Sequence, residues 1–363
     1  MAFVQKTEFE LIASGLGYPE GPIYEPDGSI LLVELLEIKD ERLPGLTRVK
    51  PDGSVQRIVD IKGGPNGAAF GKDGQVYIAN SGGFDWLPIP LDPEGKKVMY
   101  LGTTEPESYE GGRIERVDIS SAAPQVEDLY RTCYKGFDNM GFGKRKPKEV
   151  KDFKPVGLRG PDDLVFDKSG GFWISDFGKQ RPRNADVTGI YYATADGQNI
   201  TEMIYPLAAP NGIGLSPKED RLYATLTYAR QVVYWKLDKD SPGTIIPNPN
   251  TMDGSWLLTA KLPGQAILDS MAVDEDGNVY VAIMLPKGNT PFSNGGIAVI
   301  SPDGESIDFM EINIEGEFAP LPSNLCFGGP DRKTLYVTCG ASGLLAKADV
   351  VIPGLALNNN PYS

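Results

Sequence analysis

The sequence contains no histidine among its 363 residues. A Ser-His-Asp triad and a Cys-His pair both need an imidazole, so hydrolysis by either arrangement is excluded. Imidazole-ligated zinc and copper sites are excluded for the same reason. Any chemistry must therefore come from carboxylates, amides, hydroxyl groups, Lys, Arg, or a metal ion held by oxygen ligands.

Cysteine is scarce, and long apolar runs are missing. Cys133, Cys326 and Cys339 form no C-x-x-C pair, and such a small, odd set is typical of reduced intracellular thiols. No apolar run approaches the roughly 20 residues that a membrane-spanning helix needs. Lys6 and Glu8 stand where a signal peptide would require an apolar core. We therefore expect a soluble, cytoplasmic protein.

Positively charged residues are too few to balance the negative ones. The chain has 35 Lys and Arg and 49 Asp and Glu, which gives a formal net charge of −14. A polyanion repels phosphate backbones and anionic membrane surfaces, so we expect neither nucleic acid nor a membrane as a partner. The acidity is compatible with a site for a hard cation. The 43 Gly and 30 Pro are scattered singly and mark many turns, which favours an all-β protein.

Six segments repeat one pattern, in which two β-rich stretches follow a small turn and are joined by a tight hairpin. The segments begin at Pro19, Pro65, Pro161, Pro210, Leu268 and Pro322. Four hairpins have glycine where positive φ is needed: Asp27-Gly28, Asp73-Gly74, Ser169-Gly170 and Asp276-Gly277. Lys218-Glu219-Asp220 and Pro330-Asp331-Arg332 occupy the corresponding turn in the other two copies. A third strand follows each hairpin, and a fourth follows five of them.

This repeat predicts a six-bladed β-propeller of four-stranded antiparallel blades, formed by residues 1–363 as one domain. The sixth copy has no fourth strand after Val350, whereas the N-terminus has a spare one at 7–13. We expect the N-terminal strand to join the last blade and close the ring, which removes an open sheet edge.

Two long segments, 81–111 and 132–159, both leave the second blade and are predicted to be lid-like loops. The second is basic and shows no hairpin pattern, so we expect one long loop there and no seventh blade. Their aromatic residues predict an aromatic inner surface for the lid. These residues are Phe84, Trp86, Tyr100, Tyr109, Tyr134, Phe137, Phe142 and Phe153.

Propeller geometry brings the starts of the six inner strands together at one mouth of the central channel. A polar residue stands at nearly the same offset in each copy: Glu20, Asn66, Asp162, Asn211, Asp269 and Asn324. Buried carboxylates are costly unless something neutralises them, and oxygen-only ligands favour Ca²⁺, Mg²⁺ or Mn²⁺. The alternative is that these residues cap turns and strand starts, as Asn and Asp commonly do.

Four motifs, in this order along the chain, resemble the regucalcin/gluconolactonase/luciferin-regenerating-enzyme family. They are Pro19-Glu20-Gly21-Pro22, Gly160-Pro161-Asp162-Asp163-Leu164-Val165-Phe166-Asp167, Pro210-Asn211-Gly212-Ile213-Gly214 and Asp269-Ser270-Met271-Ala272-Val273-Asp274. The resemblance extends over essentially the whole chain. It implies a six-bladed propeller with one divalent cation at the channel mouth, for which Ca²⁺ is the expected ion and Mn²⁺, Mg²⁺, Fe²⁺ and Zn²⁺ are alternatives.

The resemblance also implies roles for individual residues. Glu20, Asn211 and Asp269 match the metal ligands of the family. Asp162 stands where the family usually has Asn, so it adds a negative charge as a fourth ligand or a neighbouring acceptor. Gly160 lies where sugar-lactonase members carry Arg, with Arg159 next to it.

The family resemblance implies hydrolysis of a small-molecule lactone. Asp269 matches the residue that acts as general base, with a role as ligand alone as the alternative. We expect substrate contacts from Asn66, Asp162, Arg159, Asn324, Trp86 and Thr227. The aromatic lid favours a lactone that is bulkier or less polar than a simple aldonolactone. Two other functions stay open, a phosphotriesterase-type hydrolase on the same site and a non-catalytic calcium-binding propeller, as does the oligomeric state.

Overall fold

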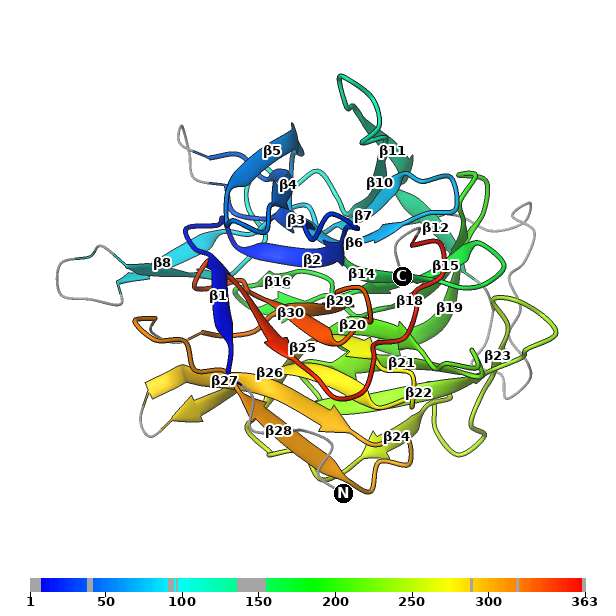
Figure 1. Cartoon of the computed structure of the whole chain (residues 1–363). Coiled ribbons are helices and arrows are strands. Elements are labelled where there is room, and N and C mark those ends of the chain that lie inside the picture. Colours follow the sequence, from blue (N-terminus) through cyan, green and yellow to red (C-terminus); the bar gives the residue numbers. More distant parts are fainter. Residues whose placement is uncertain are drawn as a thin grey trace.

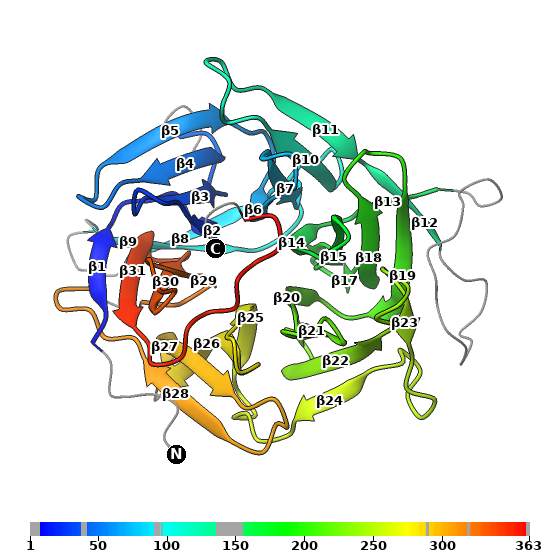
Figure 2. The ribbon, with the colours of Figure 1, turned by 45° about the vertical axis from the view of Figure 1, so that its right-hand side comes forward.

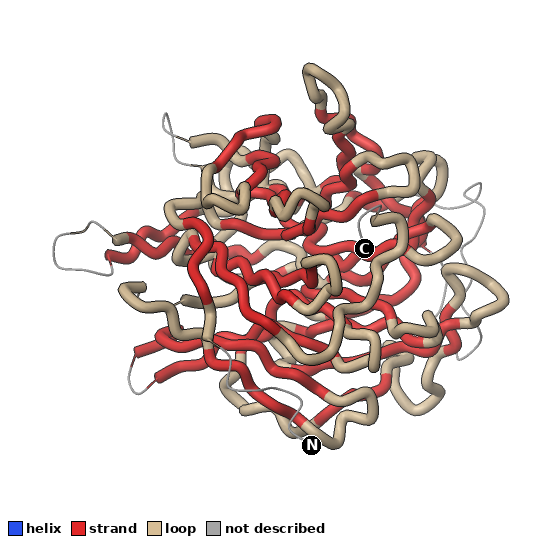
Figure 3. The backbone as a smooth tube through the Cα atoms, in the orientation of Figure 1, coloured by secondary structure: helices blue, strands red, loops and turns tan. Residues whose placement is uncertain are grey.

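The chain folds into small β-sheets arranged in a ring around a channel (Figures 1 and 2). The structure is a computed structural model that describes residues 8–37, 42–90, 95, 97–135, 155–287, 290–317 and 320–360. Within these ranges the chain forms strands, turns and loops (Figure 3), and no helix is long and apolar enough to cross a membrane. The six blades confirm the predicted six-bladed β-propeller.

Each blade presents one strand to the channel and three successive strands outward. The inner strands are β2 (Pro19–Tyr24), β6 (Pro65–Phe70), β14 (Pro161–Phe166), β20 (Pro210–Leu215), β25 (Ile267–Val273) and β29 (Asn324–Gly328). The second strands are β3 (Ile30–Glu34), β7 (Val76–Asn80), β15 (Gly171–Asp176), β21 (Arg221–Leu226), β26 (Val279–Lys287) and β30 (Thr334–Cys339).

The outer half of each blade completes an antiparallel meander. The third strands are β4 (Gly45–Val49), β10 (Arg113–Val117), β18 (Thr188–Thr194), β22 (Gln231–Leu237), β27 (Thr290–Ile300) and β31 (Leu344–Asp349). The fourth strands are β5 (Val55–Asp60), β11 (Val126–Tyr130), β19 (Ile200–Leu207), β24 (Trp256–Thr259), β28 (Ile307–Glu311) and, for the last blade, β1 (Glu10–Ala13). A short strand, β23 (Ile245–Ile246), also pairs with β22.

The N-terminal strand closes the ring as predicted. β1 pairs antiparallel with β31, with Glu10 opposite Lys347 and Leu11 opposite Ala346. The strand is shorter than the predicted 7–13, and position 7 lies outside the described residues. The first and last segments of the chain thus share one blade, which leaves no open edge between them.

The hairpins inside the blades adopt the backbone that their sequences predict. Gly28 and Gly170 have φ of 85° and 89°, values that glycine adopts without steric cost. In the two copies without glycine, Glu219 and Arg332 occupy the same left-handed region, with φ of 51° and 55°. The fold therefore requires this turn geometry in all six blades, whichever residue provides it.

The hydrophobic core lies between the blades and not in the channel. One cluster of buried apolar side chains fills the space between each pair of neighbouring blades, giving six clusters around the ring. In the cluster between blades three and four, for example, Trp173 of β15 packs with Leu222 of β21 and Trp235 of β22. Because every blade is packed on two sides, the inner strands are held firmly in place around the axis.

The long segment 81–111 forms a hairpin of β8 (Trp86–Pro90) and β9 (Val98–Gly102). It starts in blade two and reaches blade six, where the amide of Tyr100 donates to the carbonyl oxygen of Ala341 at 2.9 Å. Near its tip the ammonium of Lys97 pairs with Glu317 at 3.0 Å. This segment is therefore anchored on blades other than its own.

The prediction that 132–159 is one loop without strands is wrong at its two ends. β12 (Thr132–Lys135) pairs antiparallel with β13 (Val156–Gly157) and parallel with β19, which adds both to the outer edge of blade three. The pairing satisfies backbone groups that an extended connection would leave to water. Residues 136–154, with Phe137, Phe142 and Phe153, lie outside the described residues.

The end of the channel opposite the inner-strand starts is covered by the C-terminal segment, which crosses the ring after β31 (Figure 2). The amide of Leu355 donates to the carbonyl oxygen of Val273 at 2.9 Å, and the Asn358 side chain donates to Phe166 O at 3.1 Å. A cavity of about 200 Å³ lies in the channel between this segment and the site residues. Its lining includes Asp163 and Asn324 at the site end and Leu355 to Asn358 of the C-terminal segment at the other.

Two further short strands, β16 (Gln180–Arg181) and β17 (Asn184–Ala185), form a hairpin in the mouth loop of blade three.

Candidate functional site

Irregular pairing at the start of five inner strands positions the predicted ring of polar side chains. In β6, β14, β20 and β25 the register with the second strand shifts across the segments that contain Asn66, Asp162, Asn211 and Asp269. In β2 the shift follows Glu20 directly. Such bulges change the direction of a side chain and are frequent beside functional sites. The regular strand pairing is therefore interrupted at or beside the polar residue in five of the six inner strands.

The sixth blade departs from this pattern. β29 pairs regularly with β30 from Asn324 onward, without a bulge. The Asn324 side-chain oxygen accepts the amide of Leu325 at 2.7 Å, so part of its hydrogen-bonding capacity is used locally.

The site residues are buried in spite of their polarity. Glu20 is 3% exposed, Asp162 4% and Asn211 6%, whereas Asp269 is partly exposed. Asn66 donates to the Asp162 carboxylate at 3.1 Å. The hydroxyl of Ser270 lies 3.4 Å from the side-chain oxygen of Asn211. Side chains from blades far apart in the sequence therefore meet at this mouth.

The carboxylates raise one another's pKa. Burial raises the pKa of Glu20 well above its usual value, and the charges of Asp269 and then Asp162 raise it further, while a hydrogen bond from Ser323 opposes the rise. Burial likewise raises the pKa of Asp269 to about 7, against a hydrogen bond from Asn211. The charge of Asp163 also raises the pKa of Asp269, so acidic groups of blades one, three and five influence one another at this mouth. The chain thus keeps several acidic groups in a small desolvated space.

These residues fit a hard divalent cation. Glu20 Oε2 is buried and has no hydrogen-bond partner among the residues that the structure describes. A buried carboxylate oxygen without a partner is costly unless a cation or a ligand meets it. The donor set consists of carboxylate and amide oxygens, which Ca²⁺, Mg²⁺ and Mn²⁺ prefer.

The described ranges contain no group of three or more Asp, Glu, Cys or His side chains close enough to share one metal ion. The predicted ligands Glu20, Asn211 and Asp269 include only two carboxylates, and the third is an amide. The absence of three clustered acidic side chains therefore does not exclude them. The assignment of Asp162 as a fourth ligand stays a prediction.

Small residues let the inner strands approach each other directly behind the ring. A Cβ added at Gly67 would lie 2.6 Å from Cα of Asp163, and one at Gly212 would lie 2.6 Å from Cα of Ser270. Burial raises the pKa of Asp163 itself to about 7. Asp163 is a site neighbour that the sequence interpretation did not single out, although it stands next to Asp162 in the same motif.

The predicted substrate-contacting residues of blades three and four are already engaged within the protein. The guanidinium of Arg159 pairs with Asp186 at 3.1 Å. The hydroxyl of Thr227 donates to the carbonyl oxygen of Leu268 at 2.8 Å, so it holds the backbone next to Asp269. These contacts position the rim of the site.

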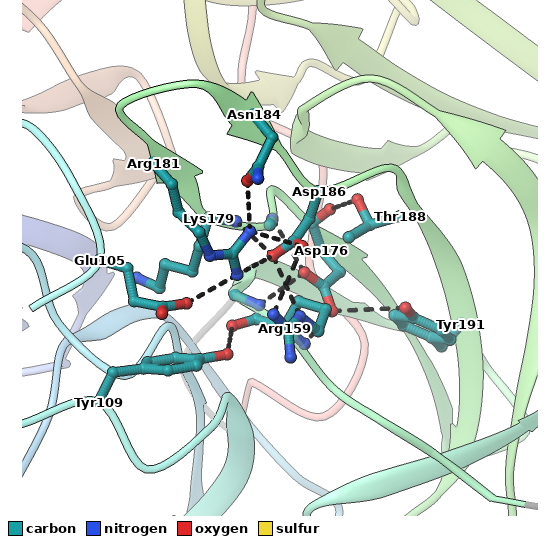
Figure 4. A network of polar contacts seen from close by, with 12 residues as sticks. Glu105, Tyr109, Arg159, Asp176, Lys179, Arg181, Asn184, Asp186, Thr188 and Tyr191 are labelled. Atoms are coloured by element: carbon teal, nitrogen blue, oxygen red, sulfur yellow. Dashed lines mark hydrogen bonds and ion pairs between the residues drawn. The ribbon is translucent and has the colours of Figure 1, made fainter.

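A network of ion pairs and hydrogen bonds ties segment 81–111 to blade three (Figure 4). Arg181 bridges Glu105 at 2.8 Å and Asp186 at 3.0 Å. The Asp176 carboxylate accepts the amides of Arg159 at 2.9 Å and Gly160 at 2.7 Å, which fixes the chain just before Asp162.

Lys179 is a second residue that the sequence interpretation missed. Its side chain is 1% exposed, its ammonium donates to Gly83 O at 2.5 Å, and the ammonium lies 3.8 Å from the centre of the Phe84 ring. Burial lowers its pKa to about 7, against the attraction of Asp176 and Asp162. No local signal reveals this residue, because its hydrogen-bond partner Gly83 lies 96 residues earlier in the chain.

Trp86 forms part of an aromatic cluster beside the mouth. Its ring lies 4.8 Å from that of Tyr18 and 5.8 Å from that of Phe84, measured between centroids. Phe177 and Tyr228 form a second aromatic pair at 5.5 Å on the loops of blades three and four. The rim of the mouth therefore combines aromatic rings with paired charges.

Comparisons with known proteins agree with this fold. A gluconolactonase from Zymomonas mobilis is 24% identical over 353 residues, which cover 92% of this chain and 79% of that protein. Lactonase drp35 from Staphylococcus aureus is 35% identical over 122 residues, which are 34% of this chain and 35% of that protein. The crystal structure of regucalcin from Agrobacterium tumefaciens, described as a calcium-binding protein, superposes with a TM-score of 0.62 over 99% of both chains at 16% identity, a likeness of fold.

The family pattern described as the SMP-30/gluconolactonase/LRE-like region matches residues 18–341. This range contains all six inner strands and every residue of the polar ring. The chain belongs to the SMP-30/gluconolactonase/LRE-like family.

Proposed function

We propose that the protein is a lactone hydrolase that works with one divalent cation at the channel mouth. The observation that carries the proposal is the set of buried carboxylates and an amide, in which Glu20 Oε2 lacks a partner among the described residues. The names of the relatives from Zymomonas mobilis and Staphylococcus aureus support lactone chemistry. The calcium-binding description of the regucalcin structure supports Ca²⁺ as the ion.

Glu20, Asn211 and Asp269 would hold the cation, with Asp162 beside them. When bound, such a cation polarises the lactone carbonyl and stabilises the negative charge that develops on its oxygen. The amide of Asn211 adds a neutral oxygen ligand, and its contacts with Ser270 and Asp269 fix its orientation. Binding would remove the cost of keeping the Glu20 carboxylate buried and unpaired.

Asp269 would act as the general base. It is the partly exposed member of the set, so water and substrate reach it. Its carboxylate takes a proton from water while the water oxygen bonds to the carbonyl carbon. The ring C–O bond then breaks, the ring oxygen takes the proton back from Asp269, and a hydroxy acid leaves.

Segment 81–111 would serve as a lid, because the β8–β9 hairpin is anchored on blade six and its return is tied to blade three. Asn66 and Asn324 would complete the wall of the site.

The three cysteines are all free and buried, which supports the proposed cytoplasmic location.

A substrate panel tests this function. γ- and δ-lactones with polyhydroxy and with apolar substituents would be followed in a pH-stat, beside a phosphotriester, with added Ca²⁺ or Mn²⁺ and after thorough chelation. We expect ring opening with a cation, loss of activity on chelation and recovery when the cation is restored.

Each alternative gives a different outcome in the same panel. Turnover of the phosphotriester alone would identify the other hydrolase. Cation binding without turnover of either class would identify a non-catalytic propeller. Lactone opening that survives chelation would contradict the role of the cation, and Asp269→Asn with unchanged activity would contradict the role of the base.

A further inference from the structure

Tyr18 stands two residues before Glu20, the site residue of blade one, in an unusual backbone conformation. Its φ is 57°, in the left-handed region that non-glycine residues rarely adopt. Such strain persists only where surrounding contacts impose it, and it gathers at active sites. Here the Tyr18 carbonyl oxygen accepts the amide of Leu35 at 3.2 Å, and Glu20 follows two residues later.

The ring of Tyr18 is held on two sides. The Trp86 ring lies against it with centroids 4.8 Å apart. On blade six, a Cβ at Gly340 would come within 2.6 Å of Tyr18 Cε1, so the bare backbone of Gly340 touches the ring. Gly340 is itself fixed, because its amide donates to Ser323 Oγ at 3.0 Å. The direction of the ring is therefore set before any ligand binds.

The hydroxyl of Tyr18 has no hydrogen-bond partner among the residues that the structure describes, although Tyr18 is only partly exposed. Tyrosine hydroxyls in such positions usually have one. Burial raises the pKa of Tyr18 well above its usual value, and the charges of Asp269, Glu20 and Asp162, in that order, raise it further. The hydroxyl thus belongs to the same space as the proposed base and metal ligands, and it has a free proton to donate.

We propose that the Tyr18 hydroxyl donates a hydrogen bond to the carbonyl oxygen of the substrate. The proposal rests on the proposed function, because it assigns a further substrate-contacting residue to that same site. As water adds to the carbonyl carbon, the C=O electron pair moves to the oxygen, and the hydrogen bond from Tyr18 strengthens with the growing charge. When the ring C–O bond breaks, the ring oxygen takes its proton from Asp269, and Tyr18 keeps its own.

Tyr18→Phe tests the inference because it keeps the ring and its contacts and removes only the hydroxyl. Loss of one donor to a developing oxyanion costs about 10²–10³-fold in kcat. We expect a fall of about 100-fold in kcat for lactone opening, with KM changed much less. Tyr234→Phe is the matched control, since this partly buried tyrosine stacks on Trp256 in the outer part of blade four at 5.7 Å. It should open lactones at the wild-type rate.

A binding measurement separates failure of this inference from failure of the proposed function. δ-Valerolactam presents the same kind of carbonyl and resists hydrolysis, so its affinity is measured by calorimetry on the cation-loaded protein. One neutral hydrogen bond is worth about a five-fold change in Kd, and we expect Tyr18→Phe to bind the lactam about five-fold more weakly.

Each possible outcome supports or overturns the role of the Tyr18 hydroxyl. If the wild type opens lactones and Tyr18→Phe does so equally well, the inference is overturned and the function stands. If the wild type opens no lactone, the function fails and the lactam titration decides alone. Equal lactam affinity in the two proteins, or no lactam binding to the wild type, overturns the inference.

Discussion

Asparagine at position 162 should stabilise the cation-free protein and weaken its binding of a cation. Asp162 is 4% exposed and accepts a hydrogen bond from Asn66 at 3.1 Å. An asparagine there keeps an oxygen for Asn66 and loses only the charge. Burial raises the pKa of Asp162 well above its usual value, Asp269 and Asp163 add to the rise, and Lys179 opposes it.

The raised pKa of Asp162 determines how the stability of the cation-free protein changes with pH. A carboxyl with a raised pKa holds its proton in the folded protein at a pH where the unfolded chain, with a pKa of about 3.9, has released it. The associated stabilisation is fully present below the unfolded pKa and is lost as the pH rises through the folded pKa. Asp162 therefore destabilises the cation-free protein more at pH 8 than at pH 5.

The size of the effect follows from the desolvation cost of a buried polar group, which is about 1–3 kcal/mol and at least as large for a charged one. Unfolding entropy is about 2.1 cal/mol/K per residue, so 363 residues give about 0.8 kcal/mol/K. The variant should thus unfold about 1–4 °C higher than the wild type at pH 8. With saturating cation the order should reverse, because the wild type has one more carboxylate at the site.

Differential scanning calorimetry in excess chelator at pH 5 and pH 8 measures this difference. Asp240→Asn, which changes an exposed aspartate, is the control and should leave Tm unchanged at both pH values. A variant that is no more stable than the wild type at pH 8 would refute the electrostatic reasoning. A gain of equal size at pH 5 would refute it as well.

Two further predictions concern the framework of the site. Gly67→Ala should destabilise the protein by about 1–3 kcal/mol, because its Cβ would meet Cα of Asp163 at 2.6 Å; calorimetry checks this, and an unchanged Tm would show that the strands separate easily. Arg181→Met should change global stability by less than about 1 kcal/mol, since its ion pairs are partly exposed, and yet speed amide exchange in residues 97–111, where its partner Glu105 lies. Unchanged exchange there by mass spectrometry would show that the network does not hold the segment.

The blades could be predicted from the sequence because their signals are local. A turn such as Asp27-Gly28 between two β-rich stretches identifies a hairpin without reference to the rest of the chain. Closure of the ring by β1 could be predicted as well, because one repeat lacked a strand that the N-terminus supplied. Polar residues at equal offsets in the repeats likewise predicted a polar residue near the start of each inner strand, where the structure has all six.

The details that depend on contacts between distant residues could not be predicted. The bulges at Asn66 and Asp162 depend on pairing with the second strand and on the close approach of neighbouring inner strands at glycines such as Gly67. The contact of Lys179 with Gly83 and Phe84 joins segments that share no sequence signal. Likewise, the pairing of β12 with β19 depends on the free outer edge of blade three, which no local pattern in 132–159 indicates.

Titration of Ca²⁺ into chelator-treated protein by calorimetry tests most directly whether Glu20, Asn211 and Asp269 hold a cation together. We expect one ion per chain for the wild type and no measurable binding for Glu20→Gln, which keeps the shape of the side chain and removes the charge. Equal affinity and stoichiometry in the two proteins, or no binding of Ca²⁺ or Mn²⁺ to the wild type, would contradict the account.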